Sequence, residues 1–327
     1  MEWIWLSRVL SLLLATGLGV GSVVGFFLGA NAVVMRLPRA WQERCLPWVY
    51  VSPAIALLSA YLVLPTLNTI YLSFLDRRSE SFVGFANYAF VLRDNAMGIA
   101  IRNNVLWLVL VTGFSVGLGL LLAVLSDKVR YEAIAKSTIF LPMAISFVGA
   151  STIWKFVYAY RPAGREQIGL LNVIATGVGS DPIGWLVERP LNTFALIAIM
   201  IWLQTGFCMV LLSAAIKAIP ADILEAARID GANEWQIFWR IAMPTIRPTI
   251  AVVATTVVIL VLKVFDIVYV TTAGNQGTEV LASRMIKEMF NFGNFGRGSA
   301  IAVVLMMAIL PVVVINIRRA RREEAGS

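Results

Sequence analysis

The sequence predicts an all-α membrane protein with about seven transmembrane helices. Hydrophobic residues make up 59% of the 327 residues, charged residues only 14%, and the mean hydropathy of +0.80 lies far above the usual range of soluble proteins. A bilayer core about 30 Å thick requires roughly 20 apolar residues per helix. The apolar runs are unbroken and lack the alternation of a barrel wall, which excludes a membrane β-barrel.

Apolar segments of the required length recur along the whole chain. They cover residues 9–34, 48–74, 103–126, 138–158, 193–216, 249–272 and 299–317. Within the first segment, glycine recurs every four residues and forms one stripe on a helix face, at Gly17, Gly21, Gly25 and Gly29. This stripe predicts a tightly packed helix contact, within the chain or with a partner, although glycine is also generally frequent in membrane helices.

The composition excludes several kinds of chemistry. The chain has no histidine, and its two cysteines, Cys45 and Cys208, lack the spacing of metal ligands. We therefore expect no metal site and no His-based catalysis. The net charge of +8 comes from basic residues in loops that flank the spans, which indicates membrane topology rather than nucleic-acid binding.

The orientation of the chain is predicted from its basic residues. Lys and Arg are slightly more frequent in the loops on the C-terminal side, and the sequence RRARR at 318–322 follows the last span directly. The positive-inside rule therefore predicts a cytoplasmic C-terminus, and seven spans then place the N-terminus outside. Because the N-terminus lacks a basic region and a small-residue cleavage site, we do not expect a removed signal peptide.

A polar segment, EAARIDGANEWQIFWRIAMP at 225–244, lies in the loop between the fifth and sixth spans. The pattern predicts two short helices, the first starting near Asp222 with Glu225 in capping-box spacing; Gly231 separates them, and Pro244 closes the second. Three aromatic residues share one face of the second helix, Trp235, Phe238 and Trp239. A helix this amphipathic is expected to dock either in the headgroup region of the membrane or on another protein.

The spacing of this segment resembles the EAA loop of ATP-binding cassette (ABC) importer permeases. It begins with Glu225, Ala226 and Ala227, continues with Gly231, and ends with Ile241, Ala242, Met243 and Pro244, where Met243 replaces the usual Leu. Further stretches are similar to carbohydrate-type, maltose- and glycerol-phosphate-permease-like subunits, which are inner membrane components of binding-protein-dependent transport. These stretches are FVGFANYAFVL at 82–92, NNVLWLVL at 103–110, FLPMAIS at 140–146, WLQTGFCMVLLSAAIKAIPADILEAA at 202–227 and VFDIVYVTTAG at 264–274.

The resemblance implies a division of the chain and a set of partners. Residues 47–320 would form a six-helix type I importer core, with the cytoplasmic EAA loop at 217–248. Residues 1–46 would add one helix and a cytoplasmic linker, and residues 321–327 a cytoplasmic tail. In the bacterial inner membrane, such a chain pairs with a second, related permease as a heterodimer, with two ATPase subunits and with an extracytoplasmic solute-binding protein.

The resemblance also implies that ATP and Mg are bound by the partner subunits, and the chain itself has no phosphate-binding loop motif. The resemblance therefore implies no cofactor, no catalytic residue and no enzymatic activity in this chain. The EAA segment would act as a coupling helix in a cleft of the ATPase, and alternating access would follow from ATPase closure. Its predicted coupling residues are Glu225, Ala226, Ala227, Asp230, Gly231, Trp235, Phe238, Trp239 and Pro244.

Polar groups within the spans indicate a solute pathway, because such groups are costly in lipid. Gln204 lies near the middle of the fifth span, and Lys263 and Asp266 lie in the outer half of the sixth. Lys263 and Asp266 either belong to the solute pathway as well or, being three residues apart, pair with each other on one helix face. By resemblance to maltose-like permeases, the solute contacts are Met143, Phe147, Gln204, Phe207 and Val264. Since this set lacks a cluster of basic residues, we expect a small neutral polyhydroxy solute, such as a sugar, a glycoside or a sugar-derived osmolyte.

Other functions remain as alternatives. A stand-alone secondary transporter or channel would need no docking helix, and a membrane enzyme would need a catalytic constellation beside the acidic pair Glu225 and Asp230. Within the ABC permeases, Lys263 leaves open a phosphorylated or other non-sugar solute.

Overall fold

The computed structural model is built from helices and describes residues 2–127 and 129–326, without the side chains of residues 2–4, 6 and 319–326. Most of the basic tail at 318–322 and residue 327 therefore lie outside the described side chains. The helices that are long and apolar enough to cross a membrane are Ser7–Val34, Arg39–Leu72, Asn95–Ser126, Leu191–Lys217, Glu234–Leu262 and Phe295–Arg318. A bent helix pair at 132–157 provides a seventh span if both parts are counted as one, and the predicted all-α membrane class is confirmed.

The chain divides into two compact units, and the first comprises residues 1–68. Its helices are α1 (Glu2–Val34), α2 (Arg39–Leu58), the π-helical turn η1 (Ser59–Val63) and the start of α3 (Leu64–Leu72). The turn between α1 and α2 is short, because the Gln42 side-chain amide donates hydrogen bonds to the carbonyls of Met35 (3.0 Å) and Leu37 (2.8 Å). The linker expected before residue 47 is therefore mostly helix, and the second span begins at Arg39 rather than at residue 48.

The glycine stripe of α1 does not support a close contact with α2. A Cβ atom built on Gly17, Gly21, Gly25 or Gly29 would meet no neighbouring atom within 4 Å. The two helices instead contact each other through side chains such as Phe27 and Tyr50, whose rings stack with centroids 5.7 Å apart.

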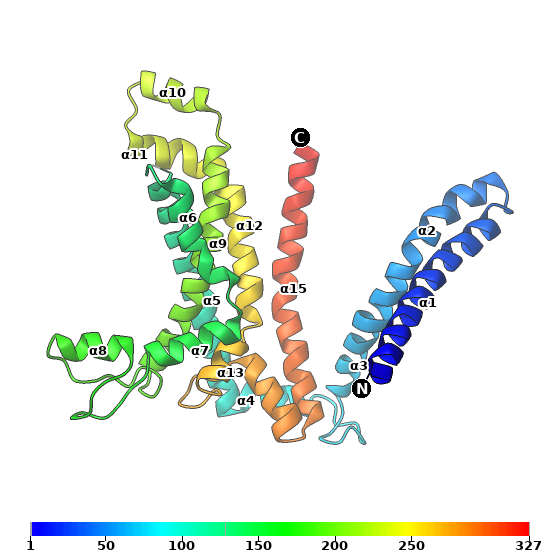
Figure 1. Ribbon diagram of the computed structural model, residues 1–327, viewed down its shortest axis with the longest axis horizontal. Coiled ribbons are helices and arrows are strands. Elements are labelled where there is room, and N and C mark those ends of the chain that lie inside the picture. Colours follow the sequence, from blue (N-terminus) through cyan, green and yellow to red (C-terminus); the bar gives the residue numbers. More distant parts are fainter. Residues whose placement is uncertain (1, 128, 327) are drawn as a thin grey trace. The chain divides into compact units, whose positions relative to one another are not determined.

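The second unit, residues 69–327, contains the remaining helices (Figure 1). They are α4 (Ala86–Arg93), α5 (Asn95–Ser126), α6 (Glu132–Phe140), the 3₁₀ turn η2 (Leu141–Ala144), α7 (Phe147–Val157), α8 (Leu170–Gly177), α9 (Leu191–Lys217), α10 (Ala221–Ile229), α11 (Glu234–Ile237), the π-helical turn η3 (Phe238–Ala242), α12 (Met243–Leu262), α13 (Asp266–Thr271), α14 (Leu281–Ile286), the π-helical turn η4 (Lys287–Asn291) and α15 (Phe295–Gly326).

Helix α9 forms the centre of this unit. In the most apolar stretch of α9, 67% of the residues are buried, against 28% or less in the other described spans. Helix α9 packs along α5 and α12. The approach of α5 is close, because a Cβ on Gly119 would lie 2.5 Å from Cys208 Cβ. Gly206 allows a similar approach to α6, since a Cβ there would lie 2.4 Å from the Ile139 carbonyl oxygen. Small residues thus let other helices reach the backbone of α9.

Two predicted spans are broken, which differs from the continuous helices expected at 138–158 and 249–272. Helices α6 and α7 meet at an angle of 101°, and Figure 1 shows α7 running across the ends of the upright helices. The 3₁₀ turn contains Pro142, and Ser146 restarts the chain as the N-cap of α7. The second break separates α12 from α13 at Lys263–Phe265.

Candidate functional site

The two breaks border one pocket of about 460 Å³. Its lining residues are Met143, Ile145, Ser146, Phe147, Val148, Leu203, Gln204, Leu260 and Asp266. They come from the α6–α7 bend, from the middle of α9, from the end of α12 and from the start of α13. This volume lies in the range of small-molecule sites, and the lining is mainly apolar with a few polar groups, as is typical of such sites.

Gln204 is the most buried polar side chain of the pocket, with 3% exposure. It lies at the midpoint of α9, and its Oε1 atom has no hydrogen-bond partner in the described part of the chain. A buried acceptor without a partner costs about 1–3 kcal/mol, so this atom is suited to a ligand that donates a hydrogen bond.

The predicted substrate-pathway residues are only partly brought together. Met143, Phe147, Gln204 and Asp266 line the pocket. Val264 and Lys263 line a small adjacent cavity that also contacts Phe147 and Asp266. Phe207 lines neither cavity and instead packs against the hydrophobic core.

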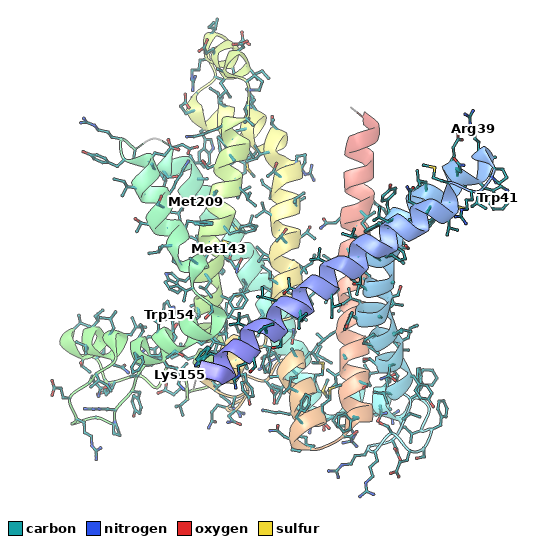
Figure 2. The ribbon with its side chains drawn as sticks, turned by 45° about the vertical axis from the view of Figure 1, so that its right-hand side comes forward. Arg39, Trp41, Met143, Trp154, Lys155 and Met209 are labelled. Atoms are coloured by element: carbon teal, nitrogen blue, oxygen red, sulfur yellow. The ribbon has the colours of Figure 1, made fainter. Side chains whose placement is uncertain are left out.

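The expected helix-face pair of Lys263 and Asp266 is wrong. Lys263 is the C-cap of α12, and Asp266 begins α13, so the two residues are not on one continuous helix. Among the described residues no ion pair or hydrogen bond links them. Lys155 lies on α7 beside Trp154, and Met143 lies at the bend between α6 and α7 (Figure 2). The Lys155 ammonium approaches the Val270 carbonyl at 3.4 Å.

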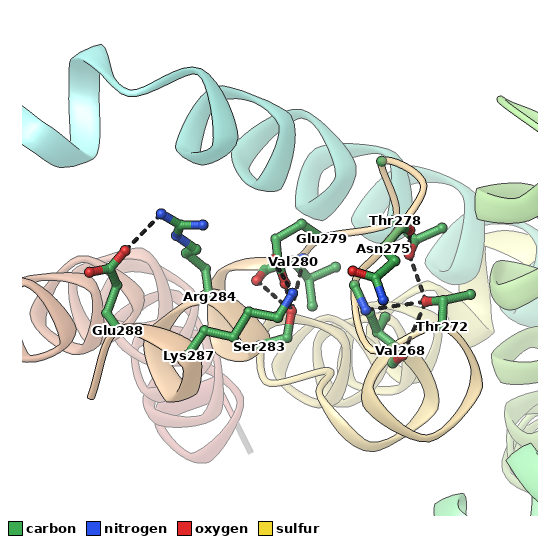
Figure 3. A network of polar contacts seen from close by, with 12 residues as sticks. Val268, Thr272, Asn275, Thr278, Glu279, Val280, Ser283, Arg284, Lys287 and Glu288 are labelled. Atoms are coloured by element: carbon green, nitrogen blue, oxygen red, sulfur yellow. Dashed lines mark hydrogen bonds and ion pairs between the residues drawn. The ribbon is translucent and has the colours of Figure 1, made fainter. Parts of the chain in front are cut away.

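The loop after α13 is held by a network of polar contacts (Figure 3). Glu279 accepts hydrogen bonds from Ser283 and from Lys287, the latter at 2.6 Å. Two neighbouring asparagines of α5 also hold the loop: Asn103 donates to the carbonyls of Gly277 (2.7 Å) and Glu279 (2.8 Å), and Asn104 accepts from the Leu281 N–H (2.8 Å). These asparagines were not predicted from the sequence, because their partners lie more than 170 positions away.

The polar segment at the opposite end of the bundle forms the two helices that the sequence predicts, α10 and α11. Helix α10 ends in a Schellman motif, in which the Ala232 N–H donates to the Ala227 carbonyl (3.0 Å) and the Gly231 N–H to the Arg228 carbonyl (3.1 Å). Gly231 has a φ of +82°, which disfavours other residues. A Cβ there would meet no atom of this chain within 4 Å, so the backbone conformation, rather than crowding within the chain, requires glycine.

The helix caps of this segment differ from the prediction. Pro220 is the N-cap of α10 and makes no side-chain capping bond, so the capping box expected at Asp222 and Glu225 is wrong. The capping box forms at α11 instead, where Asn233 accepts from the Gln236 N–H and the Gln236 side chain accepts from the Asn233 N–H, both at 2.9 Å. The Asn-x-x-Gln spacing was a readable signal for this cap.

Pro244 does not close the second helix as expected. It lies in the first turn of α12, and α11, η3 and α12 form one continuous helix at 234–262. A proline lacks the N–H that would bond four residues back. The π-helical turn η3 accommodates this loss by shifting the ladder, because the Met243 N–H donates to the Phe238 carbonyl. The polar segment is thus joined to the sixth span without a flexible loop.

The aromatic face of α11 and η3 borders a groove of about 480 Å³. Trp235 contacts Trp239 edge-on with ring centroids 5.7 Å apart, and Phe238 contacts Trp239 at 5.2 Å. Trp235 remains 71% exposed and Trp239 49% exposed. Of the other predicted coupling residues, Glu225, Ala226 and Asp230 are exposed and Ala227 is buried. Arg228 bridges to Glu234 at 2.9 Å, which ties α10 to α11 and raises the pKa of Arg228.

A charged cluster lies beside this groove and was not predicted. Lys136 of α6 donates to Asp127, to Glu132 (2.6 Å) and to Ser213 of α9, while Ser213 donates to Asp127 (2.8 Å). Lys217 completes the cluster by pairing with Glu132. Asp127 also lines the groove. The cluster therefore fixes the start of α6 to the end of α9 directly behind the coupling segment.

Broken spans around a mainly apolar pocket with a few polar groups, together with an amphipathic helix pair at one end of the bundle, are typical of a membrane transport subunit. The chain matches the family of binding-protein-dependent transport system inner membrane components over residues 105–320, and it belongs to that family. It is therefore a multi-span permease subunit of an ABC importer and a non-catalytic component of it, as the sequence predicts.

Curated relatives and solved structures agree with this family. The chain is 72% identical over 276 residues to the osmoprotective compounds uptake permease protein GgtC of Synechocystis, covering 84% of this chain and 99% of that protein. It is 50% identical over 281 residues to the alpha-glucoside transport system permease protein AglF of Rhizobium meliloti, covering 86% and 84%. The crystal structure of a bacterial ABC transporter that imports the acidic polysaccharide alginate shares the fold, with a TM-score of 0.76, 22% identity and coverage of 87% and 99%.

Proposed function

We propose that the chain forms half of the solute pathway of an ATP-driven importer for a neutral glycoside or a sugar-derived osmoprotective solute. Its partners would be a second, related permease, two ATPase subunits and an external solute-binding protein. The loop at 217–248 and the C-terminus would face the cytoplasm, and the N-terminus would lie outside. Family membership and the relatives that import osmoprotective compounds and alpha-glucosides support this proposal.

The pocket around Gln204 is the observation that carries the choice of solute. Its polar side chains are those of Ser146, Gln204 and Asp266, and its lining contains no Lys or Arg. Hydroxyl groups both donate and accept hydrogen bonds, so a polyhydroxy solute matches this set, whereas a phosphorylated solute would leave its charge unpaired. The apolar remainder, including Phe147 and Met143, would contact the carbon skeleton of the solute.

The coupling segment would transmit ATPase closure to this pocket through α12. The exposed side chains of Glu225 and Asp230 would bond to the ATPase, while Trp235, Phe238 and Trp239 would fill its docking cleft. The continuous helix from 234 to 262 ends at the break beside the pocket. A displacement of the docked end would therefore move Leu260 and the residues of the break, which gives a physical route for alternating access.

The proposal is tested with the complete importer in proteoliposomes, loaded with ATP and supplied with its binding protein. We expect uptake of radiolabelled alpha-glucosides or glucoside-type osmolytes that depends on ATP and on the binding protein. Gln204→Leu should raise the solute concentration for half-maximal ATPase stimulation about tenfold, because one hydrogen bond to the solute is lost. Thr205→Val is the matched control, since that hydroxyl bonds to Ile201 of its own helix (2.7 Å). Uptake without ATP, or equal curves for both variants, would refute the proposal.

A further inference from the structure

The start of α7 borders the pocket that already contains Gln204. Its first regular hydrogen bond runs from the Ala150 N–H to the Ser146 carbonyl (2.8 Å), and the Gly149 N–H donates to the Ser146 hydroxyl (3.1 Å). The N–H groups of Phe147 and Val148 precede these bonds and have no acceptor within the helix. Both residues line the pocket. This helix end follows directly after the bend of 101° that borders the pocket.

Acceptors of the pocket come from the other two helices. Gln204 presents its unpartnered Oε1 atom, which is buried at 3% exposure of the residue. Asp266 is half-buried at the start of α13, and its carboxylate makes no hydrogen bond or ion pair with any described residue. Lys263 lies at the helix break, is exposed, and shares the adjacent cavity with Asp266, but no ion pair or hydrogen bond joins the two residues. The pocket thus contains one carboxylate without a partner among the described residues and one neutral buried acceptor.

We propose that Asp266 determines specificity in this pocket by accepting hydrogen bonds from two adjacent hydroxyl groups of an uncharged solute and by excluding anionic analogues. This inference rests on the proposed function, since it concerns the same pocket. A carboxylate has two oxygens and accepts two parallel hydrogen bonds, so neighbouring hydroxyls on one sugar ring match it. Gln204 accepts from a further hydroxyl, and the α7 amides donate to hydroxyl oxygens. A carboxylate or phosphate on the solute is repelled by the like charge of Asp266, which disfavours binding.

The test measures solute binding by the whole importer in lipid nanodiscs, without nucleotide and without the binding protein. Equilibrium dialysis is performed with methyl α-glucopyranoside, with its uronic acid and with choline as radiolabelled probes. For the unmodified importer we expect the glucoside to bind at least about tenfold more tightly than either the uronate or choline, since bonds to a charged acceptor are strong. Choline binding as tight as that of the glucoside would overturn the inference, because the site would then recognise cations.

Asp266→Asn is the decisive variant. It should weaken glucoside binding about tenfold and reduce the preference over the uronate to within a few-fold. Asp266→Glu keeps the charge but moves it, so it should weaken the glucoside and still exclude the uronate. Asp181→Asn, an exposed acid outside the pocket, is the matched control and should change neither value. An Asp266→Asn variant with unchanged affinity and unchanged preference would overturn the inference.

The same variants separate this inference from the proposed function. ATP-dependent uptake of glucosides by the unmodified importer would uphold the function even if Asp266→Asn left binding unchanged. If both Asp266 variants lose all binding, size-exclusion chromatography and thermal stability in the nanodisc show whether the complex is still assembled and folded. An assembled, stable Asp266→Glu complex that binds the uronate as tightly as the glucoside would overturn the role given to the charge.

Discussion

Replacing Gly231 distinguishes two reasons for a glycine in the coupling segment. The residue lies in the left-handed region at φ +82°, where it ends α10. Apart from Gly231 and its two chain neighbours, no described atom lies within 4 Å of a Cβ built there. The backbone conformation alone predicts that Asn, which tolerates this region, is a better replacement than Ala. Close packing against an ATPase predicts the reverse, because Ala is smaller.

The expected size of the effect follows from the backbone energy. An alanine in the left-handed region costs about 1–2 kcal/mol, and a β-branched residue such as Val costs more. This corresponds to a roughly five- to thirtyfold smaller population of the loop in its docking conformation. Asn should reduce this population less than Ala does, because its short polar side chain bonds to the local backbone. We therefore expect coupling to decrease in the order Gly, Asn, Ala and Val at position 231.

The assay is binding-protein-stimulated ATP hydrolysis in proteoliposomes, with co-purification of the ATPase subunits as a second measurement. Basal hydrolysis by the ATPase subunits serves as the internal control. An importer with Gly231→Ala that is as active as, or more active than, one with Gly231→Asn would refute the backbone argument. Full activity of all three variants would remove this segment from coupling altogether.

Three further predictions concern the packing and the polar contacts of the second unit. Gly206→Ala places a Cβ 2.4 Å from a carbonyl oxygen of α6 and should destabilise the protein by about 1–3 kcal/mol, measured as a lower melting temperature in detergent. Gly113→Ala, with open space around its Cβ, is the control and should leave the melting temperature unchanged. Lys136→Met should reduce stability by about 1–3 kcal/mol, and combining it with Asp127→Asn should cost less than the sum of the single variants; strict additivity would contradict the described cluster. Asn172→Ala removes hydrogen bonds to both sides of the loop before α9 and should speed tryptic cleavage of that loop in right-side-out vesicles; unchanged cleavage would contradict its role as a brace.

The sequence predicts the spans and the coupling helices well because those features have local signals. Apolar length defines a span, and the spacing around Gly231 defines the end of α10. The Asn233–Gln236 cap was equally visible as a motif, and it was missed because Asp222 and Glu225 offered a competing pattern. The helix end predicted at Pro244 was wrong for a different reason. A π-helical turn before Pro244 preserves the helix that a proline ordinarily ends.

The breaks in the fourth and sixth spans were not predicted, because apolar composition does not distinguish a straight helix from a bent one. Pro142 was the available signal for the first break, whereas no residue of the second break, at 263–265, is a proline or glycine. The pocket forms only because both spans are broken. The sequence therefore predicts several of the lining residues but not the arrangement that brings them together. The predicted domain boundary after residue 46 stays a prediction, while the compact units of the structure divide after residue 68.

The paired breaks also determine what occupies the pocket between transport cycles. Each break releases peptide N–H and C=O groups from a helix ladder at the depth of a span, and lipid tails offer such groups no hydrogen bonds. Water must therefore fill the empty pocket. The solute then passes from one hydrated environment to another without entering the hydrocarbon core of the membrane. The barrier to leakage then lies in the apolar closures on either side of this water. A tight importer depends on the packing of those closures rather than on the polarity of the site itself.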